Sequence, residues 1–458
     1  MTSHPTPEAL ELFILGQLSA AEMREIAWHL LNGCSHCQQA TSTLWEPADS
    51  FEDPEIFEVD AGAAEGDDDA YDAALDRVLE MVAATEAAFG AEQLQARSLL
   101  AELMQVPAER QYLLVTNSHR FRTRALCDLL VEESHETGFQ DPGRSVELAR
   151  LAILLADRLA PEECGGEAGH ESLRARVWAQ LGNAYRIHSD LVEAEAALAV
   201  AEELLTAGGV GLFDRARVLA LLASLRRAQE RFAEALQLFD RVAFIYKKLG
   251  QWNLLGRTLL QRSLVCGEAG DVEAEMRMLR RALELIDPQA DPRLFLAARH
   301  NLIHALNENG QSREAFALLF HSRPLYLKMG DRMNLLKLRW VEGLVAAGLN
   351  RHEQAEAAFR EVREAYAGIG LDYDAALASL DLAGVYVAQG RTGDLLQIAE
   401  ETLAIFQSRN THRAALAAVL VLCSAARQEQ AGVGLVRQVS EFLKRARNKP
   451  DLQFPPDS

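Results

Sequence analysis

The sequence predicts an all-α protein, organised as a right-handed α-solenoid of helix pairs behind a small helical module. Hydrophobic residues make up 49% of the chain but aromatic residues only 7%, and strand-forming residues never cluster between turn signals. From Tyr71 onward apolar residues recur with helical spacing, and similar segments return about every 40 residues. The 458 residues are enough for a large core and more than one domain.

The internal repeat is visible when six short segments are aligned: "DLVEAEAAL", "RFAEALQLF", "DVEAEMRML", "QSREAFALL", "HEQAEAAF" and "TGDLLQIA". Their equivalent small or apolar positions are Ala194, Ala235, Ala274, Ala315, Ala355 and Leu395, and Leu435 continues the series. These position numbers advance by nearly the same step each time, and so small a drift indicates a true repeat. Each period contains two amphipathic stretches with a polar or glycine-bearing turn before the second, which predicts two helices per repeat.

One repeat resembles the tetratricopeptide family. It reproduces the pattern W-x2-L-G-x2-Y and its later alanines with Trp178, Leu181, Gly182, Tyr185, Ala194 and Ala201. The resemblance covers roughly residues 120–447, with six or seven helix pairs, and "DPGRSVELARLAILLADRLA" is expected to hold the second helix of an early pair. We therefore expect capping helices over 71–118, the solenoid over 119–450 and a tail over 451–458. The period of about 40, against the usual 34, predicts longer helices.

This resemblance implies a binding protein without catalysis, whose partner lies on a concave surface lined by the first helix of each pair. Carried over by position, the groove residues are Asn183, Arg186, Arg227, Arg262, His300, His304, Asn307 and Trp340. Such basic and amide groups could hold an acidic or extended peptide, although each one singly could equally be a solvated surface residue. His300 and His304 have a spacing that can chelate a metal, but no third ligand is evident, so groove or core histidines are expected.

Near the N-terminus, "HLLNGCSHC" (His29–Cys37) places Cys34 and Cys37 in a CxxC spacing just after a predicted helix. The spacing alone fits zinc, a redox pair or two idle thiols. A thioredoxin-type pair needs a strand before the motif, which is missing here. Structural zinc needs four ligands, and the expected helical hairpin would bring His4 towards the end of the second helix, near His29.

The stretch "HPTPEALELFILGQLSAAEMREIAWHLLNGCSHC" is similar to the zinc-binding anti-sigma-factor family, which has the same hairpin, its turn and the "HL" before the cysteines. The resemblance implies His4, His29, Cys34 and Cys37 as zinc ligands. Four residues separate His29 from Cys34 where the family usually has three, so His36 is an alternative ligand. It also implies that residues 1–45 are a zinc-stapled module that withholds an extracytoplasmic-function-type sigma factor from RNA polymerase.

Residues 46–70 join the two parts and contain no Lys or Arg. The formal net charge of the chain is −21, and the stretch 1–76 is strongly acidic, with Arg24 as its single base. Like charges repel, so we interpret 46–70 as a spacer, with "FEDPEIFEV" as an alternative docking segment. This charge distribution also argues against direct nucleic-acid binding.

Several further classes are excluded by pattern. Six scattered cysteines do not make a disulfide scaffold, no signal peptide opens the chain, and the longest uncharged, mostly apolar run, Ala414–Ala426, has only 13 residues. No phosphate-binding loop or nucleophile motif occurs. We therefore expect a bacterial cytoplasmic, non-enzymatic regulator or scaffold without a membrane partner. The alternatives are a scaffold with no sigma-factor partner and, third, a redox sensor that uses Cys34 and Cys37.

Overall fold

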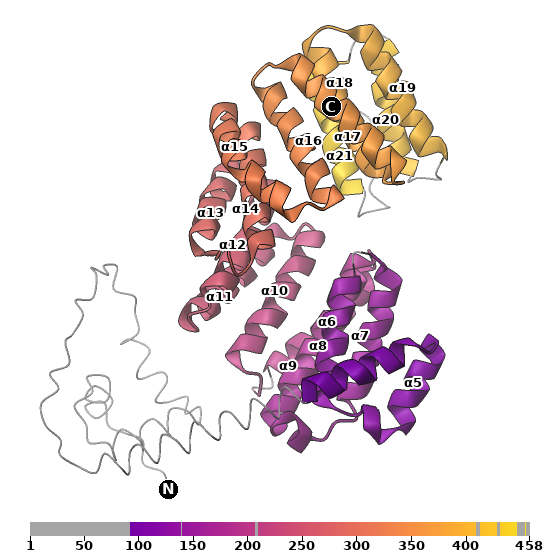
Figure 1. Ribbon diagram of the computed structural model, residues 1–458, viewed down its shortest axis with the longest axis vertical. Coiled ribbons are helices and arrows are strands. Elements are labelled where there is room, and N and C mark those ends of the chain that lie inside the picture. The colour runs from indigo at the N-terminus through magenta and orange to yellow at the C-terminus, as the bar shows by residue number, and fades with distance from the viewer. Residues whose placement is uncertain are drawn as a thin grey trace, which may run out of the picture. The chain divides into compact units, whose positions relative to one another are not determined.

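The computed structural model describes residues 92–138, 140–206, 209–408, 413–427, 431–446 and 454. The chain divides into two units, Met1–Met81 and Val82–Ser458, and the described residues all belong to the second (Figure 1). The predicted zinc ligands His4, His29, Cys34 and Cys37, the alternative ligand His36 and the acidic segment 46–70 lie outside the described residues.

The regular structure of the described residues is entirely helical, as the composition predicts. A helix over 92–104 is followed by α5 (Ala108–Asn117), η2 (His119–Phe121) and then helix pairs. Consecutive pairs are α6 (Arg124–Thr137) with α7 (Pro142–Ala156), α8 (Glu167–Ile187) with α9 (Leu191–Thr206), α10 (Leu212–Ala228) with α11 (Phe232–Lys248), α12 (Trp252–Glu268) with α13 (Val272–Leu285), α14 (Pro292–Glu308) with α15 (Ser312–Met329), α16 (Arg332–Gly348) with α17 (His352–Gly368), α18 (Asp372–Ala388) with α19 (Thr392–Ser408), and α20 (Arg413–Arg427) with α21 (Val433–Ala446). A short η3 (Pro161–Cys164) precedes α8.

The backbone of the turns between the two helices of a pair repeats with the same period as the sequence. In the six pairs from α8 with α9 to α18 with α19, one residue of this turn has a positive φ: Ser189, Glu230, Gly270, Gly310, Asn350 and Gly390. Their numbers follow the same period as the sequence repeat. Left-handed backbone is easiest for glycine and asparagine, which hold four of these six positions. The sequence period therefore reflects a fixed turn geometry as well as a packing pattern.

Close packing within a pair requires a small residue where the two helices meet. A Cβ on Gly182 would lie 2.6 Å from Cγ of Leu198 and 3.1 Å from the carbonyl oxygen of Ala194, so only glycine fits there without a shift. The equivalent Gly343 would meet the Phe359 ring at 2.7 Å. Each first helix from α8 to α16 also contacts the first helix of the next pair, so the pairs stack in series.

The alignment of the third repeat differs from the prediction by one residue. Ala274 is only half-buried, whereas Ala194, Ala235, Ala315 and Ala355 are fully buried. Each fully buried alanine from Ala235 onward comes five positions after the positive-φ residue of its turn, so the residue equivalent to Ala235 is Glu275, after Gly270. The acidic residue breaks the small-residue pattern, and the neighbouring alanine made the shifted alignment look better than the true one.

The last pair departs from the regular stacking. In the regular series a first helix packs against the next first helix, but here α21 packs against α18 while α20 packs on α19 and α21 (Figure 1). Leu435, which continues the sequence repeat, lies in α21 and packs on the apolar cluster that joins α16, α18 and α21. The spacing thus continues to the end of the solenoid, but the packing order of the final two helices is exchanged.

The four cysteines of the described residues lie inside the helical stack. Cys127, Cys164, Cys266 and Cys423 are buried and free, and burial raises the pKa of each thiol. Their thiols are therefore poor nucleophiles and poor metal ligands. In the described part of the chain, no helix combines the length and the apolar character needed to cross a membrane.

Candidate partner-binding surface

The predicted partner residues lie on the first helices, and we call the surface formed by these helices the first-helix face. Its N-terminal half runs over α6, α8, α10 and α12, and its C-terminal half over α14, α16 and α18. The repeat makes Arg186, Arg227, Gly267, Asn307 and Ala347 equivalent to one another. Basic groups thus hold this position in the first two of these repeats, and small or neutral groups hold it in the later ones.

Arg186 is the most unusual cation of the N-terminal half. Its Nε and Nη2 donate to Oδ1 of Asn183 at 3.2 and 2.8 Å, and Asn183 itself is only 2% exposed. Among the described residues, Arg186 has no carboxylate within ion-pair distance. Burial, together with the nearby positive charge of Arg227, lowers the pKa of Arg186 to about 10. An enclosed guanidinium without an anion is costly, and an anionic ligand would relieve that cost.

Other basic groups surround this position. The pKa of His135, in the last turn of α6, is lowered by burial and by the guanidinium groups of Arg257, Arg186 and Arg217. Arg217 is exposed and stacks over the Phe213 ring with 5.4 Å to its centroid. Arg257 binds the Asp291 carboxylate at 2.8 Å. The basic residues near Arg186 therefore come from α6, α10 and α12, and the charge of Arg257 is already compensated.

Arg227 is already engaged. Its Nε donates to both carboxylate oxygens of Glu268, at 3.1 and 3.0 Å. Arg227 thus holds the position equivalent to Arg186, but its charge is compensated by a carboxylate, whereas Arg186 donates to the neutral Asn183. A partner would need to compete with Glu268 for Arg227, whereas Arg186 has no carboxylate partner in the part of the chain that the structure describes.

Arg262 lies elsewhere. Its guanidinium is 3.0 Å from the Asp240 carboxylate, and Nη1 donates to Sδ of Met278 at 2.9 Å. The residue one period after Arg227 is Gly267, five positions beyond Arg262. The structure therefore places Arg262 between α11, α12 and α13, apart from the row formed by Arg186 and Arg227.

His300, His304 and Asn307 of α14 make contacts within the solenoid. Nδ1 of His300 lies 2.8 Å from the Tyr326 hydroxyl on α15, and burial and the nearby His304 and Lys337 lower its pKa to about 4. Asn307 Nδ2 donates to the Leu344 carbonyl at 3.0 Å. His304 lies 3.4 Å from Glu308. In the described part of the chain no group of three potential metal-ligating side chains forms, so His300 and His304 are packing and ion-pair residues there.

Trp340 joins two first helices. Its Nε1 donates to Oδ2 of Asp381 on α18 at 2.6 Å, and its ring meets Tyr366 edge-on with centroids 5.7 Å apart. Burial raises the pKa of Asp381, although Lys444 and the Trp340 hydrogen bond act in the opposite direction. Trp340 thus fixes α16 to α18 and is committed to a structural contact.

A group of acidic side chains was missed by the sequence analysis. Burial raises the pKa of Glu275 to about 7; the His304 charge opposes this rise, and the negative charges of Glu308 and Glu268 add to it. Of these groups, Glu308 on α14 lies on the C-terminal half of the face, together with Asp381 on α18, whereas Glu275 on α13 and Glu268 on α12 lie outside it. The one available signal was Glu275 itself, which stands where other repeats have alanine.

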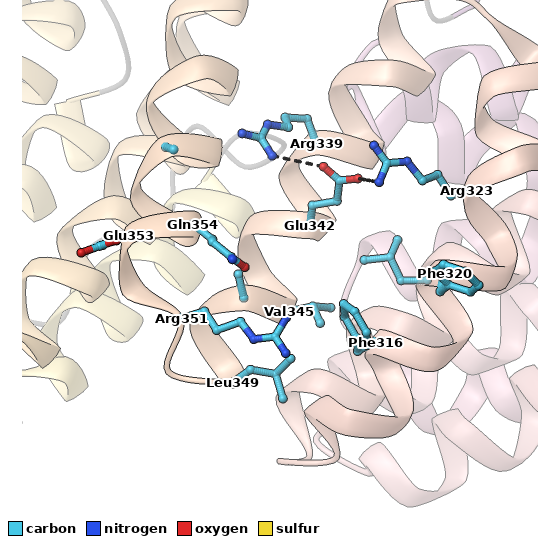
Figure 2. Close-up of a pocket in the computed structure, with 13 residues that line it drawn as sticks. Phe316, Phe320, Arg323, Arg339, Glu342, Val345, Leu349, Arg351, Glu353 and Gln354 are labelled. Carbon is cyan, nitrogen blue, oxygen red and sulfur yellow. Dashed lines mark hydrogen bonds and ion pairs between the residues drawn. The ribbon is translucent and has the colours of Figure 1, made fainter.

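A separate pocket of about 490 Å³ lies away from these positions, between α15, α16 and α17 (Figure 2). Phe316 and Phe320 form its apolar wall, and the Arg351 guanidinium lies 5.1 Å from the centroid of the Phe316 ring. At the rim Glu342 pairs with Arg339 at 3.2 Å and with Arg323 at 3.4 Å. Each of these two rim arginines thus has a carboxylate partner, in contrast to Arg186.

Comparisons with known proteins bear on the fold. No family model matches the chain. It is 28% identical over 151 residues to the regulatory protein AfsR of Streptomyces griseus, and the match spans 33% of this chain and 16% of that protein. The apo form of RapI has a TM-score of 0.50 at 11% identity, covering 70% of this chain and 86% of that one. A Rap protein complexed with competence and sporulation factor has a TM-score of 0.49 at 10% identity, covering 70% and 91%.

Identities this low establish the fold alone. The likeness nevertheless agrees with the period, the paired helices and the Gly182 contact found above. The chain has a tetratricopeptide-like helical repeat fold.

Proposed function

We propose that the chain is a non-enzymatic regulator or scaffold that binds an acidic segment of a protein or peptide on the N-terminal half of its first-helix face. The observation that carries this proposal is Arg186, an enclosed guanidinium whose hydrogen-bond acceptor among the described residues is the neutral Asn183. A carboxylate of the partner would supply the missing anion, and the exposed guanidinium of Arg217 would add favourable charge. The short match to a protein named as regulatory supports the assignment of this general class.

The binding test uses fluorescein-labelled decaglutamate as the probe and decalysine as its opposite. We expect the full chain to bind decaglutamate, and Arg186→Glu to weaken that binding at least ~10-fold because one attraction becomes a repulsion. Arg241→Glu is the matched control, since Arg241 is exposed on the second helix α11. Equal losses in the two variants, or binding of decalysine instead, would refute the assignment.

We further propose that residues 1–45 are a zinc-stapled module that restrains a sigma factor, with the solenoid as its sensor or tether. The support is the sequence: two thiols and two imidazoles at His4, His29, Cys34 and Cys37 are a donor set that zinc prefers. A hairpin of about 40 residues has too small a core to fold well alone, so metal would supply folding free energy.

The rival proposals are a scaffold with no sigma-factor partner and, more weakly, a redox sensor. Co-purification of the full chain with each extracytoplasmic-function sigma factor of its host distinguishes the scaffold without a sigma-factor partner from the anti-sigma function. A sigma factor that binds the full chain but not Cys34→Ser would support restraint, and binding to neither would leave the scaffold. Loss of zinc on mild peroxide treatment, with regain after reduction, would favour the sensor.

A further inference from the structure

The C-terminal half of the first-helix face carries a different chemistry from the N-terminal half. Several residues of α16 and α18 belong to one apolar cluster or pack against it: Leu344 and Ala347 on α16, and Leu377, Leu380 and Val387 on α18. Leu377 is only 6% exposed and Leu380 only 1%. Because Leu377 and Leu380 are on a first helix and are buried, another part of the chain must cover α18.

That element is α21. Its Val436, Val439, Phe442 and Leu443 are buried in the same apolar cluster as Leu377 and Leu380. The Tyr373 hydroxyl on α18 donates to the Leu443 carbonyl at 2.8 Å. Phe442 meets Phe454 edge-on, with ring centroids 5.0 Å apart. The strongly amphipathic α21 thus lies on α18, in the place that the next first helix, α20, would occupy in a regular series.

The exposed side of α21 is basic, and its charges act on Glu308 of α14 and Asp381 of α18. Arg437 and Lys444 are seven positions apart, so they lie on the same side of the helix two turns from each other. Burial alone would raise the pKa of Glu308. The His304 hydrogen bond and the positive charges of His304, Lys444 and Arg437 outweigh burial, so the pKa of Glu308 is lowered. Lys444 also acts on Asp381. Glu308 belongs to α14, two pairs before α18, so the charges of Lys444 and Arg437 act on groups of both helices.

We propose that α18, with α16 beside it, forms a binding site for an amphipathic helix with basic residues beside its apolar stripe, and that α21 is the resident, displaceable occupant of that site. A partner helix of the same chemistry would bind by replacing α21. This inference is independent of the acidic-segment site on α8 and α10, because it concerns different helices and the opposite charge.

A resident helix competes as a tethered ligand, with an effective concentration of the order of mM. The probe is a fluorescein-labelled peptide of residues 431–446, added to the full chain. We expect weak binding to the unaltered chain, and binding at least ~10-fold tighter to the chain with Arg437→Glu and Lys444→Glu, in which the tethered helix is weakened. Glu441→Ala, also on the exposed side of α21, is the matched control and should bind like the unaltered chain.

Hydrogen exchange supplies the second measurement. In the double variant the α21 amides should exchange at least ~10-fold faster than in the unaltered chain, while the α16 amides keep their protection. If the charge reversal leaves α21 in place, Phe442→Ala provides a second test, because it weakens the apolar contact of α21 instead of its charge contacts. If α21 stays as protected as α18 in both variants, or if neither variant binds the peptide more tightly, α21 is a permanent terminal helix and the proposal fails. A peptide carrying both charge reversals should bind neither chain, and tight binding of it would also overturn the proposal.

Discussion

Replacing Glu275 with glutamine should stabilise the folded chain at neutral and alkaline pH and change little in acid. Glu275 occupies a position that is alanine in four other repeats, and a Cβ on Gly267 would lie 2.5 Å from its carboxylate. Burial raises its pKa from 4.5 to about 7, because water is withdrawn from the ionised form. The half-buried carboxylate therefore destabilises the fold when it is charged.

The size and the sign of the effect follow from proton linkage. A carboxyl whose pKa is higher in the folded chain stabilises the fold fully below pH 4.5, and this stabilisation is lost as the pH rises through about 7. The upper limit is ~3 kcal/mol, of which ~2 kcal/mol falls between about pH 5.5 and 8.5. Partial exposure of Glu275 screens its charge, so we expect ~1–2 kcal/mol over that range.

The assay is urea unfolding at several pH values, combined with native-state hydrogen exchange of α12 and α13, since repeat stacks can open locally. The difference in unfolding free energy between Glu275→Gln and the unaltered chain should grow with pH. Glu273→Gln on the same helix is the control, because Glu273 is exposed and its change should not depend on pH in this way. Parallel stability curves for Glu275→Gln and the unaltered chain would refute the linkage argument.

Three further changes test the packing and the metal. Gly182→Ala should destabilise the chain by ~1–3 kcal/mol in thermal unfolding, because the added methyl group meets Leu198 at 2.6 Å; an unchanged melting temperature would mean that α9 shifts freely. Trp340→Phe should cost ~2–4 kcal/mol in urea unfolding, since it leaves the Asp381 carboxylate without its 2.6 Å donor, and Asp381→Asn, which keeps an acceptor there, should cost less. Zinc analysis should find about one metal ion per chain, with Cys34→Ser losing it while the solenoid melts unchanged; an unaltered zinc content would contradict the predicted ligand set.

The helical repeat could be predicted from the sequence because several independent constraints share its period. Gly182 satisfies a helix–helix contact, Ala194 and Ala235 satisfy another, and Gly270 and Gly310 supply left-handed turns. Each constraint acts within one repeat, so it selects a particular residue type at one position of every repeat. Helix pairing and stacking follow from these residue types without any knowledge of distant contacts.

The roles of individual site residues could be predicted less well, because they depend on contacts between repeats. Arg186 and Arg227 are equivalent by spacing, but Glu268, from the next first helix, neutralises Arg227 alone. Arg262 is equally basic, yet Asp240 and Met278 hold it between helices. Composition alone does not distinguish an available cation from a paired one, since the partner carboxylate comes from a neighbouring helix.

The same reasoning explains why the exchanged order of the last two helices left no sign in the repeat. Spacing records how far apart equivalent residues are, and Leu435 keeps that spacing after Leu395. Which helix covers α18 is decided by surface chemistry: Leu377 and Leu380 need an apolar cover, and α21 offers Val439 and Leu443 on its apolar stripe. Packing order is thus a property of matched surfaces, and a search for it in a sequence should compare the apolar stripes of terminal helices with the first-helix positions they could cover.

The two halves of the first-helix face differ because the repeat constrains the contacts inside each pair and leaves the outward positions free to vary. Arg186 and Ala347 hold equivalent positions on the same scaffold, yet one leaves an uncompensated charge and the other a patch of apolar surface. An uncompensated charge attracts an anion over a distance but tolerates water, whereas an apolar patch has to be covered at contact. This difference accounts for the end of the face that α21 covers, and it is consistent with the acidic partner that we propose for the other end.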